Sequence, residues 1–302
     1  MKKDEPTVGR RVLLRTAVFL GVAAAGLITT GNGIEGGTPT TPGAPGAGGA
    51  PGPAAGPGPN LAGPGGLPGA LPEKAYRLRP MTADAPARPA AVKPAVRTRP
   101  ILELPADAGT NSSMVLTFDD GPDPRYTPAI LDTLGRHGVC AMFFVCGEMA
   151  AENRDLLRRM VAEGHVIGNH TWTHPLIPKL SRPALAAEIG RTSEVVERAV
   201  GEAPQWFRAP YGAWNRAAFE IGAELGMEPL AWTVDSLDWE EPGTTTIVSR
   251  VLRGAGPRAI VLSHDAGGNR TQSVQAIASY LPQLIARGYR MTLPTLSSVA
   301  SG

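Results

Sequence analysis

The chain has 302 residues, of which 29 are Lys or Arg and 27 are Asp or Glu, for a formal net charge of +2. The sign of the charge changes along the sequence, because residues 101–302 hold 17 basic and 22 acidic residues and the positive excess precedes them. An acidic region of about 200 residues is long enough for one domain with a substantial core, and its charge argues against nucleic acid as a partner.

Residues 1–31 have the pattern of an export signal or a membrane anchor. Arg10 and Arg11, with two lysines before them, precede an uncharged, largely apolar segment that ends near residue 30. Paired arginines are found in twin-arginine signals and also in ordinary leaders, so the export route stays open. No clear Ala-x-Ala cleavage site follows, which leaves cleavage and anchoring as alternatives. We predict an exported protein that is either secreted or tethered to the outer face of the cell membrane.

Residues 32–100 are predicted to be a disordered tether followed by a basic linker. Residues 36–72 are almost wholly Gly, Pro, Ala and Thr and carry no charge, a composition that cannot bury enough apolar surface to fold. Residues 73–100 hold seven Lys and Arg against two Asp and Glu. Such a segment either contacts an anionic cell envelope or only keeps the linker soluble, and both interpretations stay open.

From residue 101 onward, short apolar runs alternate with helix-like stretches. We predict strands at residues 114–118, 141–145, 165–169, 205–209, 229–234, 259–263 and 289–293. The predicted helices are residues 127–137, 150–163, 181–200, 215–225, 245–253 and 271–287. This alternation implies a parallel sheet covered by helices, and hence an α/β fold. Cys140 and Cys146 flank the predicted strand at residues 141–145 and lie six residues apart, about 20 Å in extended chain, so we expect no disulfide between them.

Polar residues follow five of the predicted strands. The segments are "DDGP" after the first strand, "NHTWTH" after the third, "RAPYG" after the fourth, "DSLDW" after the fifth and "SHD" after the sixth. In a barrel the carboxyl ends of all strands meet at one mouth, whereas distant strands of an open sheet do not converge on one site. We therefore predict a distorted, incomplete (β/α) barrel of about seven strands.

Three of these polar residues form a predicted metal site. His170 and His174 are four residues apart, a spacing that brings both imidazoles to one side of a helical turn or a tight loop. Asp120, from another strand end, completes a set of two histidines and one carboxylate. Three protein ligands leave positions open for water and substrate, which is typical of catalytic metal sites.

The remaining polar residues predict proton transfer beside the metal. Asp119 is the expected general base, and Arg208 is the expected partner that keeps it ionised and oriented. His264 is the expected general acid, although a lone histidine is more often a core residue. Asp235, with Asp238 as a second choice, is predicted to hold the far ring nitrogen of His264.

Other residues are predicted to contact the substrate. Trp239 and Leu262, with Trp172 as a further candidate, are expected to form apolar walls, and the backbone N–H of Tyr211 is expected to stabilise an oxyanion. A metal, a base, an acid and an oxyanion donor together describe the hydrolysis of an acyl group. The nucleophile motif GxSxG and the zinc motif HExxH are both absent from the sequence.

Taken in order, these segments resemble the five motifs of polysaccharide deacetylases, the NodB-like group that forms carbohydrate esterase family 4. The matching stretches are "TFDDGP", "HTWTH", "RAPYG", "DSLDW" and "LSHD", and the resemblance extends from about residue 114 to residue 293. It implies a catalytic domain within residues 101–302 that removes acetyl groups from N-acetylated sugars and releases acetate. It also implies a divalent metal, Zn²⁺ first, with Co²⁺, Mn²⁺ or Ni²⁺ as alternatives.

The resemblance implies the same roles for the individual residues. It makes Asp119 the base, Arg208 its partner, His264 the acid, Asp235 the residue that tunes the acid and Tyr211 the oxyanion donor. Trp239 and Leu262 then form the pocket for the acetyl methyl group, and Asp120, His170 and His174 bind the metal. One position departs from the family pattern, because Ala209 stands where many relatives have proline.

Several substrates and one non-catalytic function remain open at this point. Peptidoglycan, chitin-type N-acetylglucosamine polymers and acetylated xylan all carry the acetyl group that the motifs describe. The alternative function is a catalytically silent glycan-binding module. We expect the partner to be an acetylated polysaccharide and the protein to be a monomer.

Overall fold

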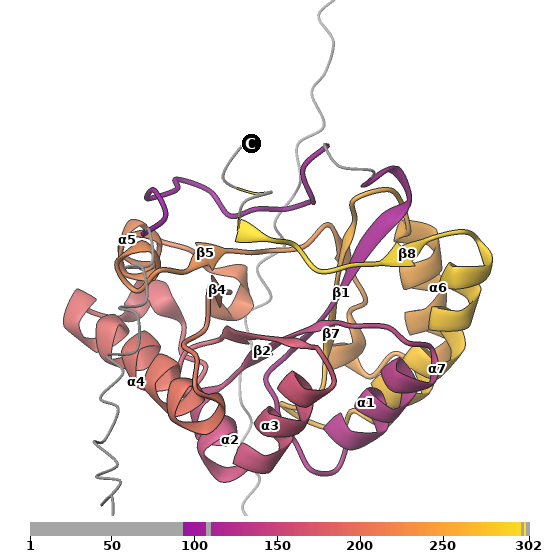
Figure 1. Cartoon of the computed structure of the whole chain (residues 1–302), viewed down its shortest axis with the longest axis horizontal. Coiled ribbons are helices and arrows are strands. Elements are labelled where there is room, and N and C mark those ends of the chain that lie inside the picture. Colours follow the sequence, from indigo (N-terminus) through magenta and orange to yellow (C-terminus); the bar gives the residue numbers. More distant parts are fainter. Residues whose placement is uncertain (1–92, 107–109, 297–298, 300–302) are drawn as a thin grey trace, which may run out of the picture. The chain divides into compact units, whose positions relative to one another are not determined.

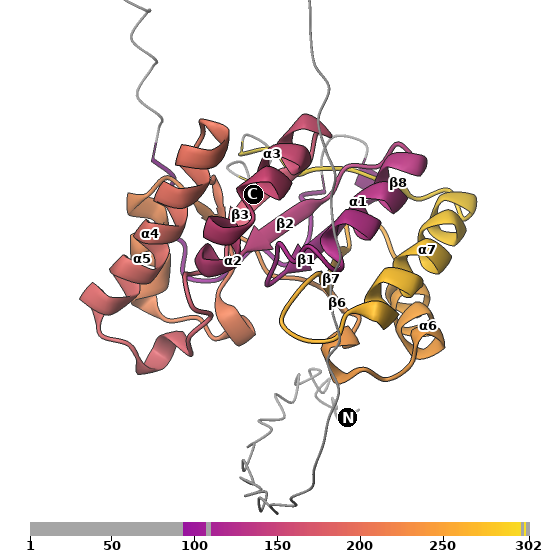
Figure 2. The ribbon, with the colours of Figure 1, turned by 90° about the horizontal axis from the view of Figure 1, so that it is seen from below.

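The computed structural model describes residues 93–106, 110–296 and 299. The predicted export signal and the Gly/Pro/Ala-rich tether lie outside these residues. The described part forms an α/β unit around a curved parallel sheet (Figure 1, Figure 2). No helix in this part of the chain is long and apolar enough to cross a membrane.

The sheet is an incomplete barrel, which confirms the predicted fold. Its strands follow the order β5-β4-β3-β2-β1-β7-β6, all paired in parallel, and β8 pairs with the beginning of β1. The strands are β1 (Ser113–Asp119), β2 (Met142–Val145), β3 (Val166–Asn169), β4 (Trp206–Phe207), β5 (Glu228–Pro229), β6 (Val234–Asp235), β7 (Ile260–His264) and β8 (Arg290–Met291).

Helices cover the outer face of the sheet. They are α1 (Thr127–Arg136), α2 (Gly147–Glu152), α3 (Arg154–Ala162), α4 (Arg182–Val200), α5 (Arg216–Glu224), α6 (Thr244–Gly254) and α7 (Thr271–Ala286). Ser181 and Asn215 cap α4 and α5 with their side-chain oxygens, as their positions in the sequence predicted.

One predicted helix is two helices in the structure. Residues 150–163 are divided because Asn153 leaves the helical conformation, with φ −121° and ψ 46°. Its side-chain amide donates hydrogen bonds to the carbonyl oxygens of Met149 and Pro122. A side chain that bonds to nearby backbone in this way competes with the helix ladder, so α2 ends and α3 begins at this residue.

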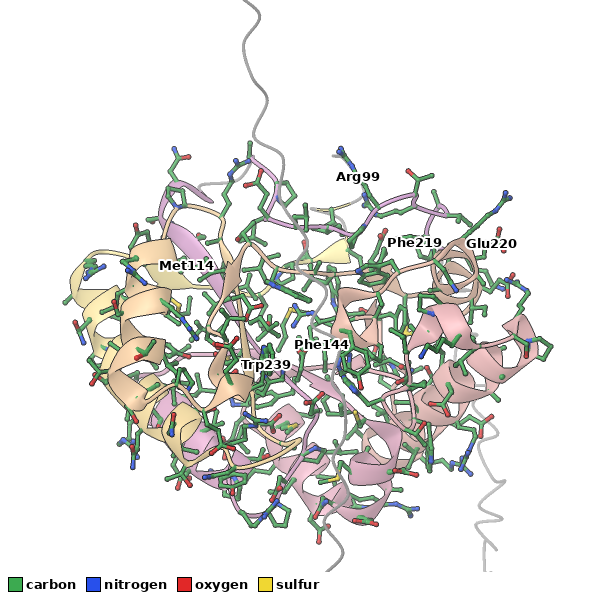
Figure 3. The ribbon with its side chains drawn as sticks, turned by 180° about the vertical axis from the view of Figure 1, so that it is seen from behind. Arg99, Met114, Phe144, Phe219, Glu220 and Trp239 are labelled. Atoms are coloured by element: carbon green, nitrogen blue, oxygen red, sulfur yellow. The ribbon has the colours of Figure 1, made fainter. Side chains whose placement is uncertain are left out.

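Alternate residues of each strand point to two different cores. Met114 of β1 packs toward the helices, whereas Val115 and the β2 residue Phe144 pack into the interior of the barrel. Met114 and Phe144 are both labelled in Figure 3. Because the side chains of a strand alternate between faces, near-continuous apolar strands are what a sheet buried on both faces requires.

The predicted strand at residues 229–234 divides into two strands at opposite edges of the sheet. β5 pairs with β4, whereas β6 pairs with β7. The intervening residues 230–233 therefore cross the gap in the barrel. Leu230 also forms a parallel bridge with Ile101. A short connecting segment spans the gap between β5 and β6, which do not pair with each other in the described sheet.

The end of the predicted linker is part of the folded domain. Arg97 forms an ion pair with Glu228 and donates a hydrogen bond to the carbonyl oxygen of Val299. Leu104 is buried in the barrel-interior core. The folded region therefore begins before residue 101, and Arg97 is engaged within the domain instead of being free for an anionic surface.

Candidate active site

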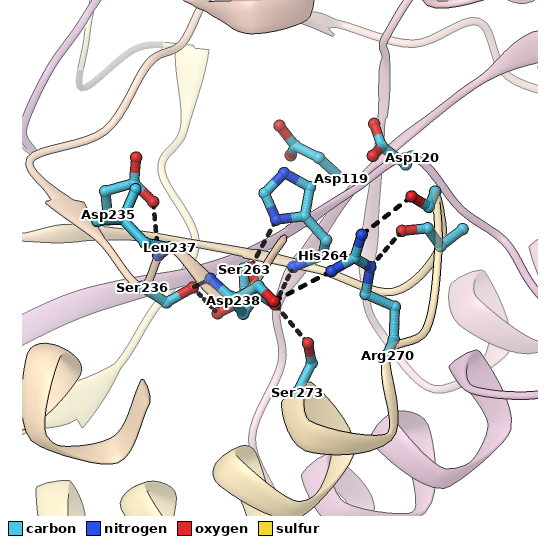
Figure 4. A network of polar contacts seen from close by, with 12 residues as sticks. Asp119, Asp120, Asp235, Ser236, Leu237, Asp238, Ser263, His264, Arg270 and Ser273 are labelled. Carbon is cyan, nitrogen blue, oxygen red and sulfur yellow. Dashed lines mark hydrogen bonds and ion pairs between the residues drawn. The ribbon is translucent and has the colours of Figure 1, made fainter. Parts of the chain in front are cut away.

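The carboxyl ends of the strands deliver the predicted site residues to one place. Asp119 ends β1 and His264 ends β7, and these two residues are direct partners in the parallel pairing of the strands. His170 follows β3 and Arg208 follows β4, which are also neighbours. Figure 4 shows the side chains of Asp119, Asp120 and His264 close together above β7. The predicted convergence on one mouth of the barrel is present in the structure.

Asp120, His170 and His174 form a cluster with the dimensions of a metal site. Asp120 Oδ1 lies 3.5 Å from His170 Nε2 and 3.4 Å from His174 Nε2, and the ligand atoms of the three residues all lie within 4.8 Å of one another. Asp120 Oδ1 is buried and accepts no hydrogen bond from any described residue. A buried carboxylate oxygen without a partner is costly, and a cation between the three residues would remove that cost.

The protonation of His170 also fits metal binding. Its Nδ1 lies 2.8 Å from the carbonyl oxygen of Arg208, which fixes the tautomer with Nδ1 protonated and leaves the lone pair of Nε2 facing Asp120. Burial lowers the pKa of His170 to about 3, although the Asp120 carboxylate opposes this effect. A neutral imidazole with an oriented second nitrogen is the form that binds Zn²⁺ and similar ions.

Asp119 and Arg208 form a buried ion pair. Arg208 Nη1 donates to Asp119 Oδ1 at 2.7 Å and to the Thr117 hydroxyl at 2.8 Å, and both charged side chains are buried. Burial raises the pKa of Asp119, while the charge and hydrogen bond of Arg208 act against this rise. The second carboxylate oxygen lies 3.6 Å from His170 Nε2, so it faces the metal cluster. The structure thus places Asp119 where a base beside the metal is expected, with Arg208 as its partner.

The partner of His264 is Asp238, and the prediction of Asp235 was wrong. His264 Nδ1 donates to Asp238 Oδ1 at 2.7 Å, and the His264 backbone N–H donates to Asp238 Oδ2 at 2.9 Å. Ser273 also donates to Asp238 Oδ2, at 2.6 Å. Figure 4 shows the other edge of the imidazole on the side of Asp119. Burial lowers the pKa of His264, but the charge and hydrogen bond of Asp238 outweigh it and raise the pKa to about 9.

Asp235 has a different role in the local structure. Its Oδ1 accepts a hydrogen bond from the backbone N–H of Leu237 at 2.8 Å, the contact drawn for it in Figure 4. Leu237 has a left-handed backbone with φ 49°, and this tight turn after β6 brings Asp238 beneath His264. The sequence separation between the two aspartates did not indicate which one the turn would direct at the histidine.

The predicted substrate-contacting residues differ in their exposure and in the residues that they contact. Tyr211, with φ 59°, packs its ring against His174 at 4.5 Å between centroids, and 68% of the residue is exposed. Trp239 is 43% exposed, whereas Leu262 is buried. Trp172 stacks under the guanidinium of Arg191, with 4.0 Å from Cζ to the ring centroid. Trp172, in the loop after β3, therefore packs against α4. The oxyanion and acetyl-pocket roles of the other three stay predictions.

Two buried residues at the site were not predicted from the sequence. Arg270 donates to the carbonyl oxygens of Ala266, Gly267 and Asp238, and so ties the β7–α7 loop to the turn that holds the His264 partner (Figure 4). Asp265 is also buried and accepts a hydrogen bond from Thr127. Burial raises the pKa of Asp265 to about 7. The "HDAGGNR" stretch has the composition of a Gly-rich loop. In the sequence, only the position of Asp265 next to His264 indicated that this stretch could belong to the site.

Comparison with known proteins identifies the family. The polysaccharide deacetylase family profile matches residues 106–230. The chain is 40% identical over 203 residues to a chitooligosaccharide deacetylase of Bradyrhizobium sp., a match that covers 63% of this chain and 93% of that protein. It is 38% identical over 187 residues to a peptidoglycan-N-acetylglucosamine deacetylase of Bacillus cereus, covering 61% of this chain and 68% of that protein.

The fold agrees with these sequence matches. A crystal structure of a peptidoglycan N-acetylglucosamine deacetylase superposes with a TM-score of 0.60 and 36% identity, covering 63% of this chain and 88% of that one. Order of motifs, fold and sequence identity all lead to the same assignment. The chain belongs to the polysaccharide deacetylase family.

Proposed function

We propose that this protein is a metal-dependent hydrolase that removes acetyl groups from N-acetylglucosamine units of a cell-wall or related polysaccharide and releases acetate. The observation that carries this proposal is that Asp119 and His264 occupy paired strand positions, with Asp119 Oδ2 3.6 Å from His170 Nε2 of the Asp120, His170 and His174 cluster. Family membership supports the reaction, since the relatives described above are named as deacetylases of chitooligosaccharide and of peptidoglycan.

A divalent ion held by Asp120, His170 and His174 would supply positive charge that polarises the amide carbonyl and favours attack by water at neutral pH. Asp119, held by Arg208, accepts the proton of the attacking water as a C–O bond forms at the acetyl carbon. His264, held as an imidazolium by Asp238, then donates its proton to the sugar nitrogen as the C–N bond breaks. The products are acetate and the free amine.

The surrounding residues bind and orient the acetyl group in this proposal. The backbone N–H of Tyr211 is the proposed donor to the oxyanion that forms during attack. Leu262 and Trp239 are the proposed walls for the acetyl methyl group. Asp235, whose Oδ1 accepts only the Leu237 N–H among the described residues, is assigned to the turn and not to proton transfer.

The metal, the location and the polymer are further parts of the proposal. Two imidazoles and one carboxylate suit Zn²⁺ first, with Co²⁺, Mn²⁺ or Ni²⁺ as competing ions. The predicted export signal and long linker support a site of action outside the cell membrane, and therefore a cell-wall polymer. Peptidoglycan fits this location, and chitin-type oligomers fit the same amide chemistry.

Acetate release by the purified protein tests the proposal. Peptidoglycan, chitin oligomers and acetylated xylan serve as parallel substrates, with and without a chelator, and Asp119→Asn serves as the inactive control. We expect acetate from an N-acetylglucosamine polymer, lost with the chelator and with Asp119→Asn. Acetate from xylan alone would establish an esterase, and glycan binding without acetate from any polymer after metal addition would establish a silent binding module.

A further inference from the structure

The loop that connects His170 to His174 has an unfavourable backbone conformation. Thr171 and His174 both have positive φ, 68° and 57°, a conformation that costs free energy for residues other than glycine. The two imidazoles must nevertheless share one side of this loop, with their Nε2 atoms facing Asp120. Other contacts must therefore hold the loop in place.

A carboxylate from α4 binds the middle of this loop. Glu188 Oε2 accepts hydrogen bonds from the backbone N–H groups of Trp172 and Thr173, both at 2.8 Å. Glu188 Oε1 accepts the Thr173 hydroxyl at 3.0 Å. Both oxygens of the carboxylate thus accept hydrogen bonds from two successive loop residues. Bonds of this type to an ionised acceptor are stronger than those between neutral groups.

The opposite side of the loop is bound by the beginning of α2. The backbone N–H of Gly147 donates to Thr171 O at 2.9 Å, and that of Glu148 donates to Trp172 O at 3.2 Å. A Cβ on Gly147 would lie 2.2 Å from the Trp172 ring, so only glycine allows this approach. The loop is held between two helices, and Glu188 is the one side chain of α4 that binds its N–H groups.

We propose that Glu188 is a positioning residue that holds the His170–His174 loop in its metal-binding geometry before the metal arrives. Glu188 contacts neither imidazole, and it acts through the two peptide groups between them. A preformed ligand set avoids the entropy cost of ordering the loop when the ion binds, so the effect is expected in metal affinity. The inference rests on the proposed function only in taking Asp120, His170 and His174 as the metal ligands.

Zn²⁺ affinity of the full chain, measured by competition with a chromophoric chelator, tests this inference. We expect Glu188→Ala to raise the Zn²⁺ dissociation constant by about 10- to 100-fold, the range typical of lost outer-shell contacts. Glu188→Gln keeps an oxygen that can accept both N–H groups, so we expect it to stay within about threefold of wild type. Glu188→Asp keeps the charge but falls one carbon short, and its expected affinity lies between the two.

Two control variants on α4 separate positioning from general stability. Glu194→Gln removes an exposed carboxylate whose ion-pair partner among the described residues is Arg198, and Val195→Ala destabilises the same helix from its buried side. Neither is expected to change the Zn²⁺ dissociation constant of the folded protein. The absorption spectrum of bound Co²⁺ provides a second readout, and we expect it to change in Glu188→Ala and not in Val195→Ala.

The outcomes distinguish this inference from the proposed function. A folded Glu188→Ala chain that binds Zn²⁺ as tightly as wild type would refute the inference and leave the proposed function intact. If Glu188→Ala does not fold, a Glu188→Asp chain that binds Zn²⁺ as tightly as wild type would refute it equally. Wild type that binds Zn²⁺ but releases no acetate would refute the deacetylase function alone, because the affinity comparison remains valid.

Discussion

Asp238→Asn tests which aspartate controls the protonation of His264, the proposed catalytic acid. The pKa of His264 is raised from 6.5 to about 9, which corresponds to about 3 kcal/mol of preference for the imidazolium. Asparagine keeps an oxygen that accepts the ring N–H, but it removes the charge that most strongly opposes the effect of burial, so the pKa of His264 falls. An acid acts below its pKa, and its activity is lost as pH rises through that value. We expect the basic limb of the kcat/KM profile to move down by about two pH units.

Acetate release from about pH 5 to 10 measures this shift. Because a lowered pKa depletes the imidazolium above neutrality, we expect roughly a tenfold loss of activity near pH 8 and a much smaller loss near pH 6. Asp235→Asn is the matched control, since Asp235 accepts a hydrogen bond from Leu237 and none from His264. The reasoning fails if Asp238→Asn leaves the basic limb in place, or if Asp235→Asn moves it instead.

Three further predictions concern the metal cluster and the linker. Gly267→Ala places a Cβ 2.4 Å from the carboxylate of Asp120, a proposed metal ligand, and should abolish Zn²⁺ binding, whereas Gly226→Ala, with equally positive φ but open space, should cost only about 1 kcal/mol of stability. Arg97→Ala leaves the buried Glu228 unpaired and should lower the urea unfolding free energy by about 1.5–3 kcal/mol, unlike the exposed Arg99→Ala. Chelation should abolish acetate release, and added Zn²⁺ should restore it; activity that persists in chelator would contradict metal dependence.

The sequence predicted the fold well because its signals were local. Hydrophobic runs located the strands, and capping residues such as Ser181 and Asn215 located the beginnings of α4 and α5. The strand-end residues Asp120, His170 and His174 were brought together as expected, because the carboxyl ends of parallel strands meet at one mouth. These features depend on pattern and topology, which a single sequence carries.

The features that were not predicted depend on the paths of short connections. Residues 229–234 were predicted as one strand because their composition is largely apolar, and only tertiary pairing divides them between two sheet edges. The choice between Asp235 and Asp238 depended on a left-handed residue, Leu237, whose type gives no sign of that conformation. Glu188 was missed for a related reason, since a half-exposed helix glutamate resembles any surface charge until the loop above it is known.

Arg208 links the segment that crosses the barrel gap to Asp119 in the candidate active site. Its guanidinium donates to Asp119, and also to the carbonyl oxygens of Leu230 and Ala231 in the segment that crosses the barrel gap. One buried cation therefore orients Asp119, the proposed base, and also holds the backbone of the segment between β5 and β6. Loss of activity on replacing Arg208 combines both effects, so it does not by itself measure how strongly the ion pair supports catalysis. The double-mutant cycle of Arg208 with Asp119 isolates the pairwise interaction, because the backbone contacts are lost in both Arg208 variants and cancel.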